Sequence, residues 1–311
     1  MQKRRVIVLT DISSLTSGYL EPDDAQSMVR FLLYSNEFDI EGLIATAYGQ
    51  HGAHPELINE LISGYKKVYP NLIKHAGGFP TARELSEKVG CGSALTGVER
   101  IGQGHATQGS DMIVSALKKP DARPLWVLIW GGALDLAQAI WQVAYTQASE
   151  EANELLGKLR VYSIGDQYDE CGPWIRAHFP QVFYITNYSA FRGMYRGGDE
   201  SLAGSDWVRE YVRNPENPLG MLYPDYDGGD PWGKVRGVKE GDTPSFLSLL
   251  PGSPAGPETP EQCGWGGQFV QTSAMHYDDS QVANAADTVS RWRTQYQSDF
   301  ARRLKWCIDA K

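Results

Sequence analysis

Three acidic residues near the start of the chain have the types and spacing of a chemical site. Asp11 directly follows the β-rich run VIVLT, and Asp23 and Asp24 stand together after a polar loop. Carboxylates gathered at one point repel each other unless a cation or shared protons lie between them. Ca²⁺ prefers carboxylate and carbonyl oxygens, so the three residues predict a cation-binding or acid–base site. The competing interpretation is a solvated loop in which Asp residues cap a helix.

Three other polar segments could contribute to such a site. The glycine pair 131–132 after LWVLIW lets the backbone approach a ligand and leaves carbonyl groups free to bind a metal. Asp242 precedes Thr-Pro, which is typical of a helix N-terminal cap. The polar run 166–170 follows the strand-like LRVYSI. We expect the later acidic residues Asp278 and Asp279 to lie on a surface loop.

The elements that must position these residues alternate between strand and helix. This order predicts an α/β fold with a mostly parallel, Rossmann-like sheet flanked by helices, in which ligands bind at the carboxyl ends of the strands. The expected strands are 6–10, 40–46, 125–130, 159–164 and 182–186, and the expected helices are 23–35, 55–68, 110–118, 133–146 and 285–308.

The segment from about 193 to 267 has a different composition, rich in Gly, Pro, Trp and Tyr. It is too aromatic for a disordered linker, so we expect long ordered loops that form the rim of a site. No internal repeat or domain boundary is evident. The interpretation is therefore one domain over residues 1–311, with these loops in its C-terminal third.

Composition limits the classes of partner. The formal net charge is -9 and no long basic run occurs, which argues against binding to nucleic acid polymers or anionic membranes through a basic patch. The apolar runs are too short to cross a bilayer, and the N-terminus lacks an export signal. We expect a soluble protein, cytoplasmic as the chain stands, or secreted or periplasmic if a signal has been removed.

The cysteines and histidines do not form a recognisable reactive motif. None of Cys91, Cys171, Cys263 and Cys307 has C-x-x-C spacing, so buried thiols are favoured, and disulfides stay open for an exported chain. The sequence also lacks H-E-x-x-H, G-x-S-x-G, P-loop and G-x-G-x-x-G motifs. The absence of these motifs argues against a zinc hydrolase, a serine esterase, a nucleoside triphosphatase and a dinucleotide-binding protein.

Several long segments together carry a resemblance to a known family. They are EPDDAQSMVRFLLYSNEFDIEGLIATAYG, VLIWGGALDLAQAI, VYSIGDQYDECGPWIRAHFP, EGDTPSFL and GWGG. The chain resembles the nucleoside hydrolase superfamily, and most closely a nucleoside hydrolase-like branch that includes proteins described as cellulose-binding. The resemblance spans almost the whole chain, and the YSNEFDIEGLIAT run is its most specific part.

The resemblance implies a calcium site with one catalytic carboxylate. It implies that Ca²⁺ is held by Asp11, Asp24, the carbonyl of Leu134 and Asp242. The cation and Asp11 would together activate water for attack at the anomeric carbon of a sugar, through an oxocarbenium-like transition state.

The same resemblance implies which residues contact the sugar. These are Asp23, which would bind vicinal hydroxyls, and Gln50, Asp166 and Asp169. The family often has His immediately before the late Asp, where it assists the departing base, but Gly241 stands there in this chain. This departure puts a purine or pyrimidine leaving group in doubt.

The preferred functional hypothesis is a Ca²⁺-dependent hydrolase of a ribosyl or furanosyl N- or O-glycoside. The alternative is a non-catalytic, cellulose-like carbohydrate-binding protein on the same fold. A metal-dependent phosphatase is weaker, because the motifs hold no Lys or Arg to receive phosphate. The expected partner is a small sugar or nucleoside-type substrate, and a homodimer is expected only by analogy.

Overall fold

The strands form one eight-stranded sheet in the computed structural model, which describes residues 2–15, 23–47, 49, 51–168, 170–225 and 236–308. All neighbouring strands are parallel except the last pair, which is antiparallel. Across the sheet the order is β3 (Val89–Cys91), β2 (Phe38–Ala45), β1 (Arg4–Thr10), β4 (Leu125–Ile129), β5 (Leu159–Ile164), β6 (Phe183–Asn187), β8 (His276–Asp278) and β7 (Val270–Gln271). The predicted mostly parallel α/β fold is confirmed.

The central strands are apolar because both of their faces are covered. Successive side chains of a strand point to opposite faces, so Val6 and Val8 of β1 join one hydrophobic core while Ile7 and Leu9 join the other. A parallel sheet covered on both faces requires this nearly continuous apolar run. The two cores fix the strands whose carboxyl ends carry the candidate site.

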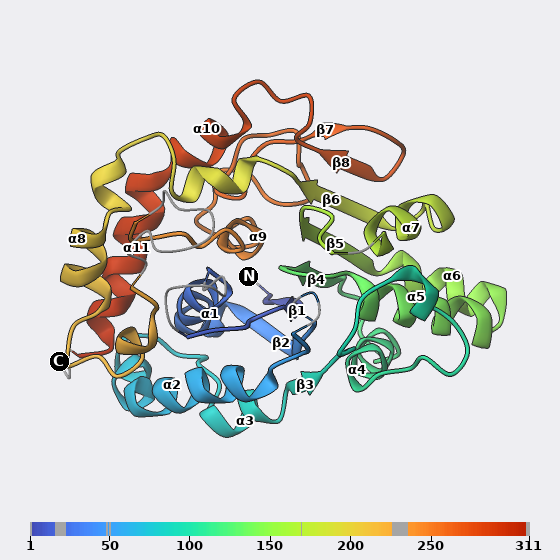
Figure 1. The fold of residues 1–311 in the computed structure, drawn as a ribbon, viewed down its shortest axis with the longest axis horizontal. Coiled ribbons are helices and arrows are strands. Elements are labelled where there is room, and N and C mark those ends of the chain that lie inside the picture. Colours follow the sequence, from blue (N-terminus) through green and yellow to red (C-terminus); the bar gives the residue numbers. More distant parts are fainter. Residues whose placement is uncertain are drawn as a thin grey trace.

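Helices cover both faces of the sheet (Figure 1). One face carries α4 (Gln108–Leu117), α5 (Leu134–Thr146), α6 (Ser149–Gly157) and α7 (Cys171–His178). The other carries α1 (Asp23–Leu33), α2 (Pro55–His75), α3 (Ala82–Ser86), α8 (Ser205–Trp207), α9 (Thr243–Leu247), α10 (Ala285–Ser290) and α11 (Arg293–Trp306). The strand order reverses between β1 and β4, which are neighbours in the sheet.

Two of the expected helices differ from the structure. The helix expected over 55–68 continues to His75, through the exposed Pro70, because Leu72 is buried in the core and extends the packed face. The single helix expected over 285–308 is instead two helices. The break between them lets the buried Arg293 donate hydrogen bonds to backbone carbonyls of the 193–199 loop.

The expectation that Asp279 lies on a surface loop is wrong. Asp279 is buried, and its carboxylate accepts hydrogen bonds from the backbone N–H groups of Tyr188, Ser189 and Ala190. It therefore fixes the chain that leaves β6 toward the candidate site. Asp278 ends β8, a strand that the sequence pattern missed because only three residues are paired.

The Gly- and aromatic-rich segment 193–267 contains short helical turns rather than long loops alone. Within its described part these are α8, α9, a π-helical turn over Val208–Val212 and 3₁₀ turns over Glu200–Leu202 and Gly220–Leu222, after the end of a 3₁₀ turn over Ala190–Met194. Its large aromatic residues Trp207, Tyr223 and Trp265 are buried in the core. Their main role is packing, and only Gly241 and Asp242 of the described segment line the candidate pocket.

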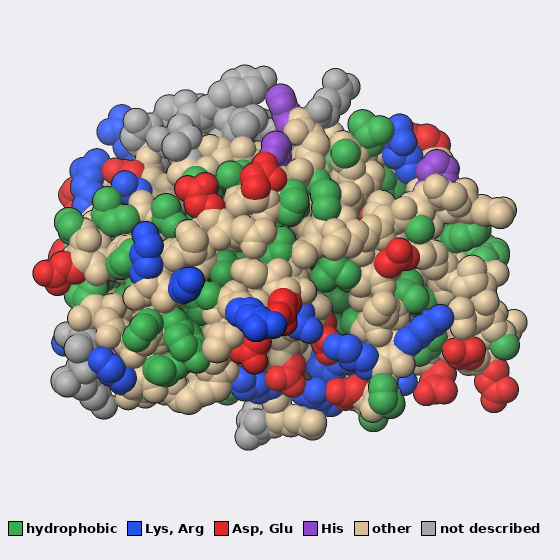
Figure 2. Space-filling view, turned by 90° about the horizontal axis from the view of Figure 1, so that it is seen from below, with side chains coloured by type: hydrophobic (Ala, Val, Ile, Leu, Met, Phe, Trp, Pro, Cys, Tyr) green, Lys and Arg blue, Asp and Glu red, His purple; other side chains and the backbone are tan. Residues whose placement is uncertain are grey.

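The surface and the thiols agree with a globular protein. All four cysteines, each within the described residues, are free thiols, and Cys171 and Cys307 are buried. Among the described residues no helix has the length and apolar character needed to cross a membrane. On the face shown in Figure 2, basic side chains lie among acidic ones rather than in a patch of one sign.

Candidate active site

A pocket of about 340 Å³ lies at the carboxyl ends of β1, β4, β5 and β6. Parallel α/β sheets bind ligands at this edge, where the strand order reverses. Its volume is at the small end of the usual range for ligand pockets. The lining residues are Asp11, Asp23, Asp24, Trp130, Ile164, Gly165, Asp166, Gln167, Tyr168, Tyr188, Phe191, Gly241 and Asp242.

Asp11 and Asp24 come from consecutive elements and are both buried. Asp11 follows β1 and is 3% exposed, and Asp24 lies in the first turn of α1 at 6%. The hydroxyl of Thr10 donates a hydrogen bond to Asp24 and accepts one from the backbone N–H of Ile12 at 3.2 Å. The end of the strand therefore fixes the orientation of the helix carboxylate.

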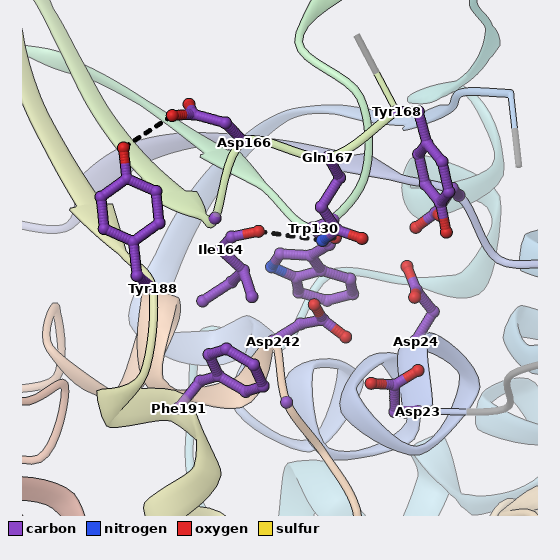
Figure 3. Close-up of a pocket in the computed structure, with 13 residues that line it drawn as sticks. Asp23, Asp24, Trp130, Ile164, Asp166, Gln167, Tyr168, Tyr188, Phe191 and Asp242 are labelled. Atoms are coloured by element: carbon purple, nitrogen blue, oxygen red, sulfur yellow. Dashed lines mark hydrogen bonds between the residues drawn. The ribbon is translucent and has the colours of Figure 1, made fainter. Parts of the chain in front are cut away.

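Asp242 completes a compact group of carboxylates. It stands at the N-cap position of α9, but its side chain makes no capping hydrogen bond. Figure 3 shows that it points toward Asp23 and Asp24 instead. One ligand oxygen from each of these three residues lies within 4.8 Å of the other two. The sequence left a cap and a metal ligand open for Asp242, and the geometry favours the ligand.

The donor set fits a calcium ion. Ca²⁺ binds oxygens at 2.3–2.6 Å, so two of its ligands lie at most about 5 Å apart. The oxygens of Asp23, Asp24 and Asp242 meet this limit, and Asp11 lines the same pocket. Repulsion between buried carboxylates favours a bound cation or proton there.

The sequence predicts that Asp23 binds the sugar and Asp11 the metal, and both of these roles stay predictions. The structure adds that an oxygen of Asp23 also lies within 4.8 Å of oxygens of Asp24 and Asp242. Leu134 is the first residue of α5 and is not among the residues that line the pocket. Its carbonyl as a metal ligand stays a prediction.

Gly131 lets Asp11 approach the end of β4. A Cβ atom added to Gly131 would lie 2.5 Å from Cγ of Asp11, closer than any ordinary contact. The glycine turn that the sequence singled out therefore has a steric reason. At Gly241, an added Cβ would lie 3.0 Å from Oδ2 of Asp23 and 3.3 Å from Cδ2 of Phe191, so a larger residue would press on the cluster.

Asp166 lines the pocket, but protein groups already hold both of its oxygens. Arg176 binds them in a two-pronged ion pair, with distances of 2.8 Å to Oδ1 and 2.7 Å to Oδ2. The hydroxyl of Tyr188 donates to Oδ2 at 2.7 Å (Figure 3). Burial and this hydrogen bond raise the pKa of Tyr188 to about 12, so the phenol keeps its proton near neutral pH. A direct sugar contact by Asp166 stays a prediction.

The two other predicted sugar-binding residues, Gln50 and Asp169, lie outside the described residues. Their proposed contacts with the sugar stay predictions.

The sequence placed Gln167 and Tyr168 in a candidate polar run but gave neither of them a role in the pocket wall. Gln167 donates to the carbonyls of Trp130 and Ile164, the latter at 2.9 Å, so it joins the ends of β4 and β5. Tyr168 is 43% exposed and has a φ of 59°. The only sequence signal for both was their place in the polar run that follows β5.

A buried ion pair supports the segment that leads to Asp242. Glu240 has a φ of 32°, which is rare for a residue other than glycine. Its carboxylate pairs with Arg30 at 2.8 Å and accepts hydrogen bonds from Tyr223 and Thr243. Strained backbone persists only where the surroundings hold it, and such places cluster at functional sites.

Comparisons with known proteins identify the family. The family model described as "Cellulose-binding Sde182, nucleoside hydrolase-like domain" matches residues 5–269. A solved structure of a nucleoside hydrolase-related hypothetical protein from Saccharophagus degradans, associated with carbohydrate metabolism, is 30% identical. The match covers 100% of this chain and 73% of the Saccharophagus chain, with a TM-score of 0.83.

More distant solved structures include two nucleoside hydrolases. A plant enzyme is 13% identical, with 100% of both chains covered and a TM-score of 0.49. The inosine-uridine preferring nucleoside hydrolase from Bacillus anthracis is 10% identical over 97% of this chain and 100% of that one, also at 0.49. A search of curated proteins finds no match. The family match and the 30% identical structure confirm the resemblance, and the chain belongs to the Sde182 nucleoside hydrolase-like family.

Proposed function

We propose that the chain is a Ca²⁺-dependent hydrolase of the glycosidic bond in a ribosyl or furanosyl N- or O-glycoside. The observation that carries the proposal is the meeting of Asp23, Asp24 and Asp242 within 4.8 Å at the edge of a parallel sheet. The pocket above them has room for a small ligand and carries the aromatic side chains of Tyr168 and Phe191 in its walls. Carboxylates suit the positive charge of an oxocarbenium-like transition state, and aromatic faces suit a sugar ring.

In this proposal Asp24 and Asp242 hold the cation, together with Asp11 or Asp23. A bound Ca²⁺ supplies Lewis-acid chemistry, which lowers the pKa of water. Asp11 orients the attacking water and accepts its proton as the water oxygen bonds to the anomeric carbon. The bond between that carbon and the leaving group breaks, and the leaving group departs with the bonding electrons.

The environment of Gly241 favours leaving groups that need little help from an acid. Glycine has no side chain to donate a proton, and the neighbouring Phe191 ring is apolar. An aryl glycoside, whose phenolate leaves readily, should therefore react faster than a purine nucleoside.

The test is the release of the phenol from aryl ribofuranosides and aryl arabinofuranosides. Wild-type protein with CaCl₂ should release it, and chelation with EGTA should stop the reaction until calcium is restored. Asp11→Asn should lose at least about 100-fold in rate, as expected for removal of a general base. Full activity in Asp11→Asn, or activity indifferent to chelation, would refute the mechanism.

A second candidate function is carbohydrate binding without turnover. The protein's own side chains engage both oxygens of Asp166, and Tyr168 is an exposed aromatic side chain at the rim of the pocket. The matching family is also described as cellulose-binding. Retention on cellulose that survives EGTA and Asp11→Asn, with no release of sugar from any glycoside, would favour this function.

A further inference from the structure

The first helix places a row of buried polar side chains against the segment that leads to Asp242. Gln26, Ser27 and Arg30 on α1 are all fully buried, which is uncommon for these residue types. Each of them bonds to the chain between residues 237 and 243. The same helix begins with Asp23 and Asp24, so the row connects the two sources of the carboxylate cluster.

Gln26 makes the largest share of these contacts. Its amide nitrogen donates to the carbonyls of Pro224, at 2.9 Å, and Gly237, at 3.0 Å. Its amide oxygen accepts from the backbone N–H groups of Lys239, at 2.7 Å, and Glu240, at 3.1 Å. The amide thus uses both donors and both acceptor positions on backbone groups, and a planar amide held by four bonds has a fixed orientation.

The neighbouring contacts continue the row on either side. The hydroxyl of Ser27 lies 3.1 Å from that of Thr243, which can accept its proton while donating its own to Glu240, and Arg30 pairs with Glu240. Asp242 stands between Glu240 and Thr243, and both of these residues bond to α1. The backbone on each side of Asp242 is therefore fixed to the helix that carries Asp23 and Asp24.

Buried polar contacts such as those of Gln26 are not required to make a folded protein stable. Replacing buried polar groups with well-packed apolar ones is often neutral or stabilising, whereas fully satisfied polar networks specify a single geometry. Residues that orient metal ligands without touching the metal also set its affinity.

We propose that Gln26 is a positioning residue that sets the spacing between Asp242 and the carboxylates of α1, and so sets the affinity of the cluster for a divalent cation. The inference rests on the proposed cation site. Gln26 does not line the pocket and acts only through the backbone that carries Asp242.

The test is isothermal titration of the full chain with CaCl₂. Gln26→Met keeps an unbranched side chain of similar length but removes all four hydrogen bonds, and it should weaken calcium binding about 10- to 100-fold. The matched control is Gln138→Met on α5. Gln138 is also buried, and its amide also bonds to backbone, accepting from Gly102 N–H at 2.8 Å and donating to its carbonyl at 3.0 Å. The control should lose stability while keeping wild-type calcium affinity.

The outcomes separate this inference from the proposed function. Calcium binding by wild-type protein and by Gln26→Met with equal affinity would overturn the positioning role alone. Equal weakening in Gln26→Met and Gln138→Met would also overturn it, because the effect would then follow general stability. Absence of calcium binding by the wild type would overturn both the cation site and this inference.

A second variant covers the case in which Gln26→Met does not fold. Gln26→Asn keeps a buried amide but is one methylene shorter, so it cannot reach all four backbone groups. It should bind calcium more weakly than Gln138→Met does. Wild-type affinity in Gln26→Asn would overturn the proposal.

Discussion

At the scale of single residues, the close approach of Asp11 to Gly131 constrains the site. The strand end that carries Asp11 and the turn after β4 meet where a Cβ would already be too close to the carboxylate. Gly131 is thus required for space, since its φ is not in the left-handed region.

Gly131→Ala should displace Asp11 and lower both stability and activity. Overpacking of this kind costs about 1–3 kcal/mol, measured here as the free energy of unfolding in urea. The rate at which the protein releases phenol from the aryl glycosides should fall together with its stability. Gly157→Ala is the control, because an added Cβ there has no heavy atom within 4 Å. Wild-type stability and activity in Gly131→Ala would show that the approach is not tight.

Residue types and spacing predicted the carboxylates but not all of their surroundings. The sequence allowed two interpretations of Asp242, a helix cap or a metal ligand, because an Asp before Thr-Pro fits both. Only the missing cap bond and the proximity to Asp24 separate them. The protein partners of Asp166 and Asp279 could not be predicted from local sequence, because the fold brings them together: Arg176 of α7 for one and the backbone after β6 for the other.

At the scale of elements, α1 and the segment before α9 act as one unit. The pair Arg30–Glu240 is completely buried, and the guanidinium also lies 3.9 Å from the centre of the Phe300 ring of α11. Since Arg30 contacts both Glu240 and α11, its loss would weaken the packing of α1 against both of them.

Arg30→Met should destabilise the protein by about 3–5 kcal/mol, because it leaves Glu240 buried without its partner charge. The measurement is urea unfolding at neutral pH. The exposed pair Arg83–Glu87 provides the control, and Arg83→Met should change stability by no measurable amount. Similar small losses of stability in both variants would mean that the buried pair does not support the segment that leads to Asp242.

Long periodic elements were predictable, and short ones were not. The strands β1, β4 and β5 and the helices α1 and α5 follow apolar patterns that local sequence carries. In contrast, β7 and β8 have two and three residues, too few for a pattern. The break before Arg293 depends on carbonyls about 100 positions earlier in the chain.

At the scale of the whole molecule, the sheet order 3-2-1-4-5-6 brings β1 and β4 together, and their ends open the pocket. This order was not predicted, because local patterns give the direction of strands but not their neighbours. A single domain over 1–311 and a homodimer stay predictions.

Stability should fall on mild acidification, partly because of His276. Burial and the nearby Arg176 lower the pKa of His276. The unfolded chain, in which His has a pKa near 6.5, therefore binds its proton more readily, so stability is lost as pH falls below about 6.5. Urea unfolding between pH 5 and pH 7.5 measures this slope.

His276→Asn should reduce the slope, whereas His105→Asn, at an exposed position, should leave it unchanged. An unchanged slope in His276→Asn would contradict the assignment to this imidazole.

The most direct test of the cation site is calcium titration of wild-type protein beside Asp24→Asn and Asp242→Asn. We expect one calcium site per chain in the wild type and at least about 100-fold weaker binding in each variant, because each variant removes a charged ligand. No calcium binding by the wild type, or equal binding by all three proteins, would contradict this expectation.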